Sequence, residues 1–384
     1  MNASKDTLVV AGGGGGDALA ALMIARTLNL DPTRTAYATI VWERTLYDAR
    51  PGPRSPEDFL DLKPVGQYNH RIGPNSALQP PSQTFVPRLA ETFGVHYYLM
   101  DIARGAWHVQ QQIAELHALH EFDTILVVDV GGDILARGDE PNLRSPTADS
   151  LTLAGMHNAP VDVYVAVCGL GLDGELTDED IADVKRDLTV NTTYRTSPAI
   201  PAEVAADYID VFRWLPSEVS GMTCAAALGY RGTAEIRSSG LRVDLSDDSP
   251  RIRIYAYEDV LNRNAVARAA LDTTSLDEAA DVVSSFGLTP EMTYERRSAQ
   301  QLAQQIEAKN GTYTPGAWAL ELETYGASVQ EDDVSYLSAR RIARVLGLNR
   351  TRLNRFTSYL SDTYPDRFQP PVWVCQPKSV GGDM

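Results

Sequence analysis

The sequence predicts an α/β protein with a Rossmann-like, mostly parallel sheet, helices on both faces of that sheet, and a helical C-terminal region. The first observation is residues 7–28 (TLVVAGGGGGDALAALMIARTL), where a short apolar strand runs into five glycines, Asp17 and an almost wholly apolar helix. A second strand at 35–44 completes a βαβ unit, whose strands are normally parallel. Two later strands are also continuous apolar runs, which is typical of strands buried on both faces.

The other expected elements follow from hydrophobic periodicity, caps and breakers. A helix and then a strand are predicted within 85–102, strands within 123–133 and 161–176, and edge strands within 233–239 and 251–258. Ser145 and Thr177 are the expected caps of two helices. Helices are predicted at 106–120, 145–157, from 177 onward, and at 201–214, 216–228, 271–287, 300–309 and 339–360.

The length of the chain predicts more than one structural unit. At 384 residues it exceeds the roughly 250–300 at which a single core stops growing. We expect a Rossmann-like α/β domain at 1–300 and a helical extension at 301–384. Prolines and glycines punctuate 47–83, so this segment is expected to be a long irregular loop. Such a loop is usually functional, and a surface excursion without a role is the alternative.

Composition narrows the cellular setting and the partners. The net charge is −17 with a sequence pI of about 4.8, which argues against a polyanionic partner such as nucleic acid. Three cysteines without a CxxC pair fit a reducing compartment. No apolar stretch reaches 18 residues. We therefore expect a cytoplasmic protein with a small-molecule substrate and no membrane partner, and leave the oligomeric state open.

Three strands end in similar glycine-acid turns: GGGGGD, DVGGD and GLGLDGE. Ligands of parallel α/β sheets bind at the carboxyl ends of the strands, where the strand order reverses. We therefore expect the three turns to share one edge and to form a site. The candidate catalytic residues are Asp17, Asp129, Asp133 and Asp173.

The backbone N–H groups of the glycines in these turns are candidates for binding a ligand. Glycine N–H groups at a helix start can face an anion. Gly12 and Gly14 fit a dinucleotide fingerprint, but Asp17 replaces its third glycine, and the run lacks the lysine of a Walker loop. A nucleotide or nucleoside, another polar ligand, and a purely structural turn all remain open. The candidate binding residues are Gly12, Gly13, Gly14, Gly15, Gly16, Glu43, Gly131, Gly132, Gly169 and Gly171.

The acids of the turns allow two kinds of chemistry. Closely spaced carboxyls can divide the roles of general acid and base. An oxygen-only cluster also suits magnesium or calcium, with Asp17, Asp133 and Glu175 as candidate ligands. The alternative is that each acid is a turn or cap residue, as Asp beside Gly often is.

Six arginines at 340–355 reverse the acidic balance of the chain locally. Their two helices and Gly347 resemble a helix-turn-helix, which predicts DNA contact by Arg350 and Arg352. A helical cap whose arginines pair with the acidic body is the alternative. In and just before the long loop, five basic residues are either contacts for an anionic substrate or solvated charges: Arg44, Arg50, Arg54, His70 and Arg71.

The motifs GGGGGDALAA, VVDVGGD, GLGLDGEL and SLDEAADVVSSFGLTPEMTYE together resemble the family catalogued as domain of unknown function 1152, found in archaea and actinobacteria. The resemblance covers roughly residues 8–295 and implies a Rossmann-like fold without a transferable reaction. A weaker likeness is to nucleoside hydrolases, which have a similar Asp-Ala-Leu-Ala helix and calcium-binding acids. Ala11 and glycines replace further aspartates of that family here, which puts the calcium site in doubt.

From these observations we expect an enzyme of small-molecule metabolism that acts on a nucleotide, nucleoside or similar polar ligand. Hydrolysis or group transfer is favoured over redox chemistry because the dinucleotide fingerprint is broken. A ligand-sensing transcriptional regulator with a C-terminal helix-turn-helix and a non-catalytic nucleotide-binding module are the alternatives.

Overall fold

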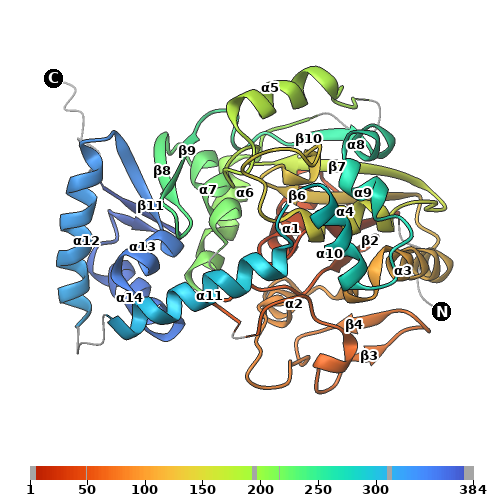
Figure 1. Cartoon of the computed structure of the whole chain (residues 1–384), viewed down its shortest axis with the longest axis horizontal. Coiled ribbons are helices and arrows are strands. Elements are labelled where there is room, and N and C mark those ends of the chain that lie inside the picture. Colours follow the sequence, from red (N-terminus) through yellow and green to blue (C-terminus); the bar gives the residue numbers. More distant parts are fainter. Residues whose placement is uncertain (1–5, 49, 193–196, 216, 309–313, 376–384) are drawn as a thin grey trace.

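The computed structural model describes residues 6–48, 50–192, 197–215, 217–308 and 314–375. Two sheets organise the protein (Figure 1). Within the described residues the main sheet has eight strands in the order β10-β7-β6-β1-β2-β5-β4-β3. Its strands are β1 (Thr7–Ala11), β2 (Thr35–Thr39), β3 (Lys63–Pro64), β4 (His70–Ile72), β5 (Tyr97–Leu99), β6 (Thr124–Val130), β7 (Asp162–Cys168) and β10 (Arg253–Ala256).

The central strands of the main sheet run parallel, and the edges are antiparallel. β7, β6, β1, β2 and β5 pair in parallel register. β10 closes one edge, and β4 and β3 close the other. The predicted α/β class with a mostly parallel sheet is therefore confirmed.

Helices cover both faces of the main sheet. Alternate residues of its strands therefore enter two separate hydrophobic cores. Leu8 and Val10 of β1 face one core, and Val9 and Ala11 face the other. The second core contains residues of α1 (Asp17–Thr27), α2 (Val86–Phe93), α6 (Ala202–Tyr208), η4 (Ile209–Arg213) and α7 (Glu218–Ala227). The first contains residues of η2 (Ile102–Arg104), α3 (Gly105–His120), η3 (Asp133–Leu135), α4 (Pro146–Gly155), α5 (Asp178–Asp187), α8 (Tyr257–Arg263), α9 (Ala265–Ala269) and α10 (Leu276–Ser285).

The chain reverses its direction across the sheet beside β1. After β1 it builds β2 and β5 on one side, and it then crosses back to place β6 and β7 on the other. The carboxyl ends of β1, β6 and β7 are therefore neighbours at the point where the strand order reverses. This is the edge where a parallel α/β sheet binds ligands.

A second sheet joins segments from before and after residue 300. Its order is β12-β13-β11-β8-β9, and β8 pairs in parallel with β11. Its strands are β8 (Gly232–Ile236), β9 (Leu241–Leu245), β11 (Val334–Ser338), β12 (Phe368–Gln369) and β13 (Val372–Val374). The helices α12 (Pro315–Gln330), α13 (Ala339–Leu346) and α14 (Arg350–Thr363) lie at the left of Figure 1 with this sheet.

The sequence predicted a C-terminal region made of helices. The structure has these helices and also the strands β11, β12 and β13. β12 and β13 are two and three residues long, too short for a period-2 pattern to be recognised. α11 (Glu291–Ala308) runs from the main sheet toward the second one (Figure 1). Residue 216, the first of the helix predicted at 216–228, and residue 309, the last of the helix predicted at 300–309, lie outside the described residues.

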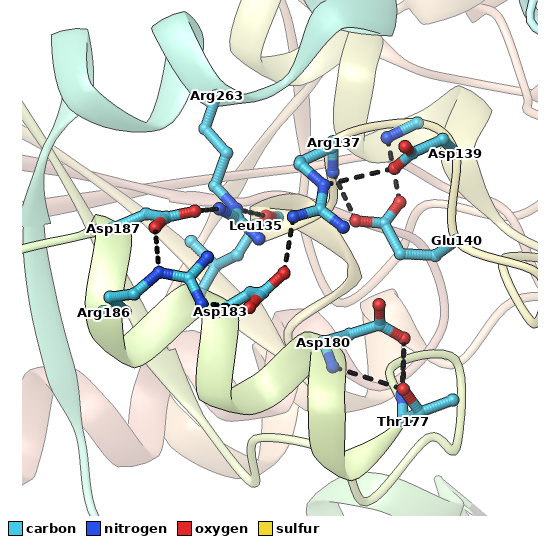
Figure 2. Close-up of polar contacts among 11 residues, drawn as sticks. Leu135, Arg137, Asp139, Glu140, Thr177, Asp180, Asp183, Arg186, Asp187 and Arg263 are labelled. Atoms are coloured by element: carbon cyan, nitrogen blue, oxygen red, sulfur yellow. Dashed lines mark hydrogen bonds and ion pairs between the residues drawn. The ribbon is translucent and has the colours of Figure 1, made fainter.

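α5 is capped at its own N-terminus, and ion pairs connect it to neighbouring elements (Figure 2). Thr177 accepts the N–H of Asp180, whose carboxylate accepts from Thr177 in return, so the predicted cap is confirmed. Arg137, which follows η3, donates to Asp183 at 2.7 Å, and Arg263, at the end of α8, donates to Asp187 at 2.6 Å.

The segment 47–83 is only partly irregular. It contains η1 (Pro56–Asp58) and the edge strands β3 and β4, and Ile72 of β4 is fully buried. These strands are short and polar, so alternation did not reveal them. In the described parts of the chain, no helix combines the length and the apolar content that crossing a bilayer requires.

Candidate functional site

A cavity of about 120 Å³ lies at the carboxyl ends of β1, β6 and β7, and we call it the acidic cavity. Among the described residues, nine carboxyl groups and three guanidinium groups line it. The carboxyl groups belong to Asp17, Glu43, Asp129, Asp133, Asp149, Asp173, Glu175, Glu218 and Glu291, and the guanidinium groups to Arg44, Arg237 and Arg340. The acids of all three predicted turns therefore meet in one place.

Asp17 begins α1 directly after the glycine run. Its Oδ2 accepts the N–H of Gly13 at 2.7 Å, and burial raises the pKa of Asp17 to about 7. Gly13, Gly14, Gly15 and Gly16 line the acidic cavity, whereas Gly12 lies behind it and donates to the Val128 carbonyl oxygen. Gly14 has to be glycine, because a Cβ there would lie 2.5 Å from the carbonyl oxygen of Trp42.

Asp129 and Asp133 come from the end of β6 and the turn after it. Asp129 accepts the N–H of Gly132 at 2.8 Å. Burial and neighbouring carboxylates hold the pKa values of Asp129 and Asp133 well above the usual range. Both side chains line the acidic cavity.

Asp173 and Glu175 follow β7 and differ in their surroundings. Burial, and then the nearby Glu175, raise the pKa of Asp173 to about 7, and its buried Oδ2 has no hydrogen-bond partner among the described residues. Glu175 accepts from Arg237 at 2.6 Å and from the backbone N–H groups of Arg144 and Ser145. Burial acts to raise the pKa of Glu175, but Arg237 and the hydrogen bonds hold it below its usual value.

The other predicted glycines do not line the acidic cavity in the described chain. Gly131 and Gly132 have φ of +125° and +103°, and a Cβ on Gly131 would lie 2.3 Å from Asp173 Oδ2. Gly169 and Gly171 also have positive φ and pack against Thr223 and Ile181. Their visible contribution is to the shape of the turns, and ligand contact by them stays a prediction.

Asp149 is a site residue that the sequence did not reveal. It lies in the first turn of α4, a helix that is buried at all ten positions, and its side chain is 4% exposed. Its buried Oδ1 has no hydrogen-bond partner in the described structure, and burial together with Asp129 and Asp17 holds its pKa well above the usual range. An acid in the first turn of a helix normally complements the helix dipole at the surface, so the position of Asp149 did not suggest a site. The one signal in the sequence is that Asp149 is the single charged residue of 146–155.

Glu43 follows β2 at the rim of the same cavity. Its Oε1 accepts from the Thr84 hydroxyl at 3.0 Å and from the Phe85 N–H at 3.1 Å, and burial raises its pKa. The structure thus places Glu43 with the turn acids, as expected from its position at a strand end.

The guanidinium groups of the acidic cavity each have an acidic partner. Arg44 contacts Glu291 at 2.5 Å and Glu295 at 3.4 Å, and Arg340 lies 3.7 Å from Glu218. Burial raises the pKa of Glu291 to about 7. Of the loop arginines considered as substrate contacts, Arg44 lines the cavity; Arg50 and Arg54 pair with Asp58 and Asp48.

The predicted metal ligands share the acidic cavity but do not form its tightest group. Asp17, Asp133 and Glu175 all line it, yet Glu175 is already neutralised by Arg237. Among the described residues, the carboxylates close enough to hold one ion are those of Asp17, Asp129 and Asp149, which each offer an oxygen within 4.8 Å of the others.

The arginine-rich helices α13 and α14 are joined through Gly347, which has the left-handed conformation. Several of their arginines face the protein body. Arg341 donates to Glu235 at 3.0 Å and to the Ser238 carbonyl oxygen, and Arg350 donates to the Tyr47 carbonyl oxygen at 2.8 Å. These contacts match the alternative of a cap that pairs with the acidic body.

Comparison with known proteins identifies the family but no activity. No curated protein and no solved structure shows significant similarity to the chain. The family model described as "Protein of unknown function (DUF1152)" matches residues 8–299, which contain every turn of the acidic cavity and both Asp149 and Glu291. The chain therefore belongs to the DUF1152 family.

Proposed function

We propose that this protein is an enzyme of small-molecule metabolism that binds a nucleotide, nucleoside or similar polar ligand in the acidic cavity and catalyses hydrolysis or group transfer. The observation that carries the proposal is the convergence of carboxyl groups from three strand ends and from α4 on one cavity at the reversal of strand order. Such an arrangement is unfavourable for folding, because each buried carboxyl is desolvated and repels its neighbours. Perturbed carboxyls gathered in a cleft are typical of functional sites.

The cavity suits acid/base chemistry by Asp133 and Asp173. Both line it, and the pKa of Asp173 is raised to about 7 by burial and by Glu175. A carboxyl with a pKa near neutrality can either give or take a proton at physiological pH. Mutual repulsion within the cluster keeps some members protonated while others are ionised, which divides the roles of acid and base.

The size of the cavity limits how much of a ligand it encloses. Its volume of about 120 Å³ is slightly smaller than the roughly 150 Å³ of an engineered cavity that holds benzene. A phosphate group or one sugar ring therefore fits inside, and the remainder of a nucleotide would extend from the mouth. Its polar, carboxyl-rich walls favour a hydroxyl-bearing group over an apolar one.

The test is a thermal-shift screen of nucleotides, nucleosides and phosphorylated sugars, followed by mass spectrometry of each stabilising compound after incubation. A ligand at 100 times its dissociation constant should add about 2.7 kcal/mol to the free energy of unfolding. Asp173→Asn should retain ligand stabilisation and lose turnover, whereas Asp101→Asn, a buried aspartate outside the acidic cavity, should retain both. No stabilising compound, or equal turnover by Asp173→Asn and the wild type, would contradict the proposal.

A further inference from the structure

We propose that Asp17, Asp129 and Asp149 together bind one divalent cation, of the magnesium and manganese type, at the base of the acidic cavity. The inference rests on the proposed function in placing the chemistry in this cavity, and it deepens that function by naming a cofactor. The ligand set differs from the one that sequence spacing indicates, because Asp149 comes from a helix and Glu175 is already paired with Arg237.

The three carboxylates come from three elements that meet at one point. Asp17 begins α1, Asp129 lies at the end of β6, and Asp149 lies in the first turn of α4. One oxygen from each lies within 4.8 Å of the other two. Oxygens bound to a common ion at roughly 2.1–2.5 Å are separated by at most about 5 Å, so the three can share one ion.

Backbone groups hold two of these carboxylates in place. The Gly13 N–H donates to Asp17 at 2.7 Å, and the Gly132 N–H donates to Asp129 at 2.8 Å. The glycine run also passes close to the third, since a Cβ on Gly13 would lie 2.6 Å from Asp17 Oδ2 and 3.4 Å from Asp149 Oδ1. Groups that orient ligands in this way are a regular part of metal sites.

An unsatisfied oxygen points to a missing partner. Asp149 is 4% exposed, and its Oδ1 is buried without a hydrogen-bond partner in the described structure. A Cβ on Gly12 or on Gly13 would lie 3.5 or 3.4 Å from this oxygen, so both glycines pass close to it. Buried polar atoms in native proteins are nearly always paired with protein, water or an ion.

Basic side chains do not fill this role in the described structure. Arg237 is paired with Glu175, and Arg44 with Glu291 and Glu295. Among the ion pairs between described residues, none involves Asp17, Asp129 or Asp149. Oxygen-only ligands select hard cations, whereas zinc and copper prefer nitrogen and sulfur. With three protein ligands the ion keeps positions for water or substrate oxygens.

The test is a titration of EDTA-treated, desalted protein with Mn²⁺, in which electron paramagnetic resonance measures the free ion. We expect one Mn²⁺ per chain in the wild type, displaced by excess Mg²⁺. Asp149→Asn should weaken binding at least about 10-fold, while Asp101→Asn, the same change at a buried aspartate outside the acidic cavity, should leave it unchanged. A thermal melt in EDTA checks folding; because Asn removes a buried unpaired carboxyl, the Asp149→Asn midpoint should not fall below that of the wild type.

Two outcomes would overturn the ion site: no Mn²⁺ bound to folded wild type at millimolar concentration, or equal affinity of the wild type and Asp149→Asn. The ion site and the proposed function fail separately. Mn²⁺ binding as expected, with no stabilising ligand and no turnover, supports the ion site and counts against the function. Ligand stabilisation and turnover that persist in excess EDTA support the proposed function and overturn the assignment of the cation as a cofactor of that function.

Discussion

At the scale of single residues, the acidic cavity depends on backbone that passes very close to carboxylates. Gly131 is the clearest example, because a Cβ there would lie 2.3 Å from Asp173 Oδ2 while φ is +125°. Positive φ alone strains any residue other than glycine. Contact with a site carboxylate adds a second cost, so the two costs can be separated by comparing glycines.

Gly131→Ala should therefore destabilise the protein more than Gly229→Ala. Gly229 has φ of +94°, and a Cβ there would meet nothing within 4 Å, so its cost is the backbone strain of about 1–3 kcal/mol. Displacement of Asp173 by the Gly131→Ala methyl should add roughly 1–3 kcal/mol. Urea unfolding followed by circular dichroism measures both, and equal losses would show that Asp173 moves aside freely.

Asp101 allows the effect of burial on a carboxyl to be measured away from the acidic cavity. It is fully buried, and burial raises its pKa to about 6 despite the hydrogen bond from Ser55. The folded state thus keeps a proton that the unfolded state releases near pH 4. A raised carboxyl pKa means that stability is lost as pH rises from about 4 through 6.

Replacement of Asp101 by Asn, which stays neutral, should remove that loss. The free energy of unfolding of Asp101→Asn minus that of the wild type should rise by about 3 kcal/mol between pH 4 and pH 7, and then level off. Urea unfolding at a series of pH values gives this difference directly. A difference that is flat with pH would mean that burial does not raise the pKa of Asp101 in the folded protein.

At the scale of elements, Arg341 of α13 connects that helix to the second sheet. Arg341 donates to Glu235 of β8, which is 4% exposed and also accepts from Tyr325 at 2.7 Å. Arg355 is exposed on α14. The two positions separate a structural role for the arginines from a role in contacting DNA.

Arg341→Met should cost about 1–3 kcal/mol, because it leaves the buried Glu235 with fewer partners. Arg355→Met should change stability by no more than about 0.5 kcal/mol, as surface changes usually do. Chemical unfolding of both variants measures the contrast. If Arg341→Met is neutral, pairing with the body does not explain this arginine, and nucleic-acid contact gains support.

At the scale of the whole molecule, the two sheets are tied together by sequence order and by the acidic cavity. β8 and β9 precede residue 300 but pair in one sheet with β11, β13 and β12 from beyond it. Arg237 follows β8 and Arg340 lies in α13, and both line the cavity beside acids from the main sheet. Neither sheet completes the cavity alone.

The chain should consequently unfold as one cooperative unit in spite of its length. Differential scanning calorimetry should show a single transition whose calorimetric and van't Hoff enthalpies agree. Two resolved transitions would mean that the second sheet folds and melts independently.

The main sheet and the turns around the cavity were predictable from the sequence because they depend on local rules. Apolar runs predicted β1, β6 and β7, and the geometry of parallel sheets predicted that Asp17, Asp129 and Asp173 would meet. Asp149, Glu291 and Arg237 were not predictable, since tertiary packing alone brings α4, α11 and β8 to the cavity. Of the strands after residue 300, β12 and β13 were missed because they are only two and three residues long, and β13 also pairs with the distant β11.

The most direct measurement is a crystal structure of the protein soaked in Mn²⁺, with diffraction data on either side of the manganese absorption edge. We predict an anomalous peak within about 2.2 Å of oxygens from Asp17, Asp129 and Asp149, and no such peak in crystals of Asp149→Asn. A fully occupied manganese elsewhere, or an acidic cavity that stays free of the ion at millimolar Mn²⁺, would contradict the assignment of this cavity as a metal-dependent site.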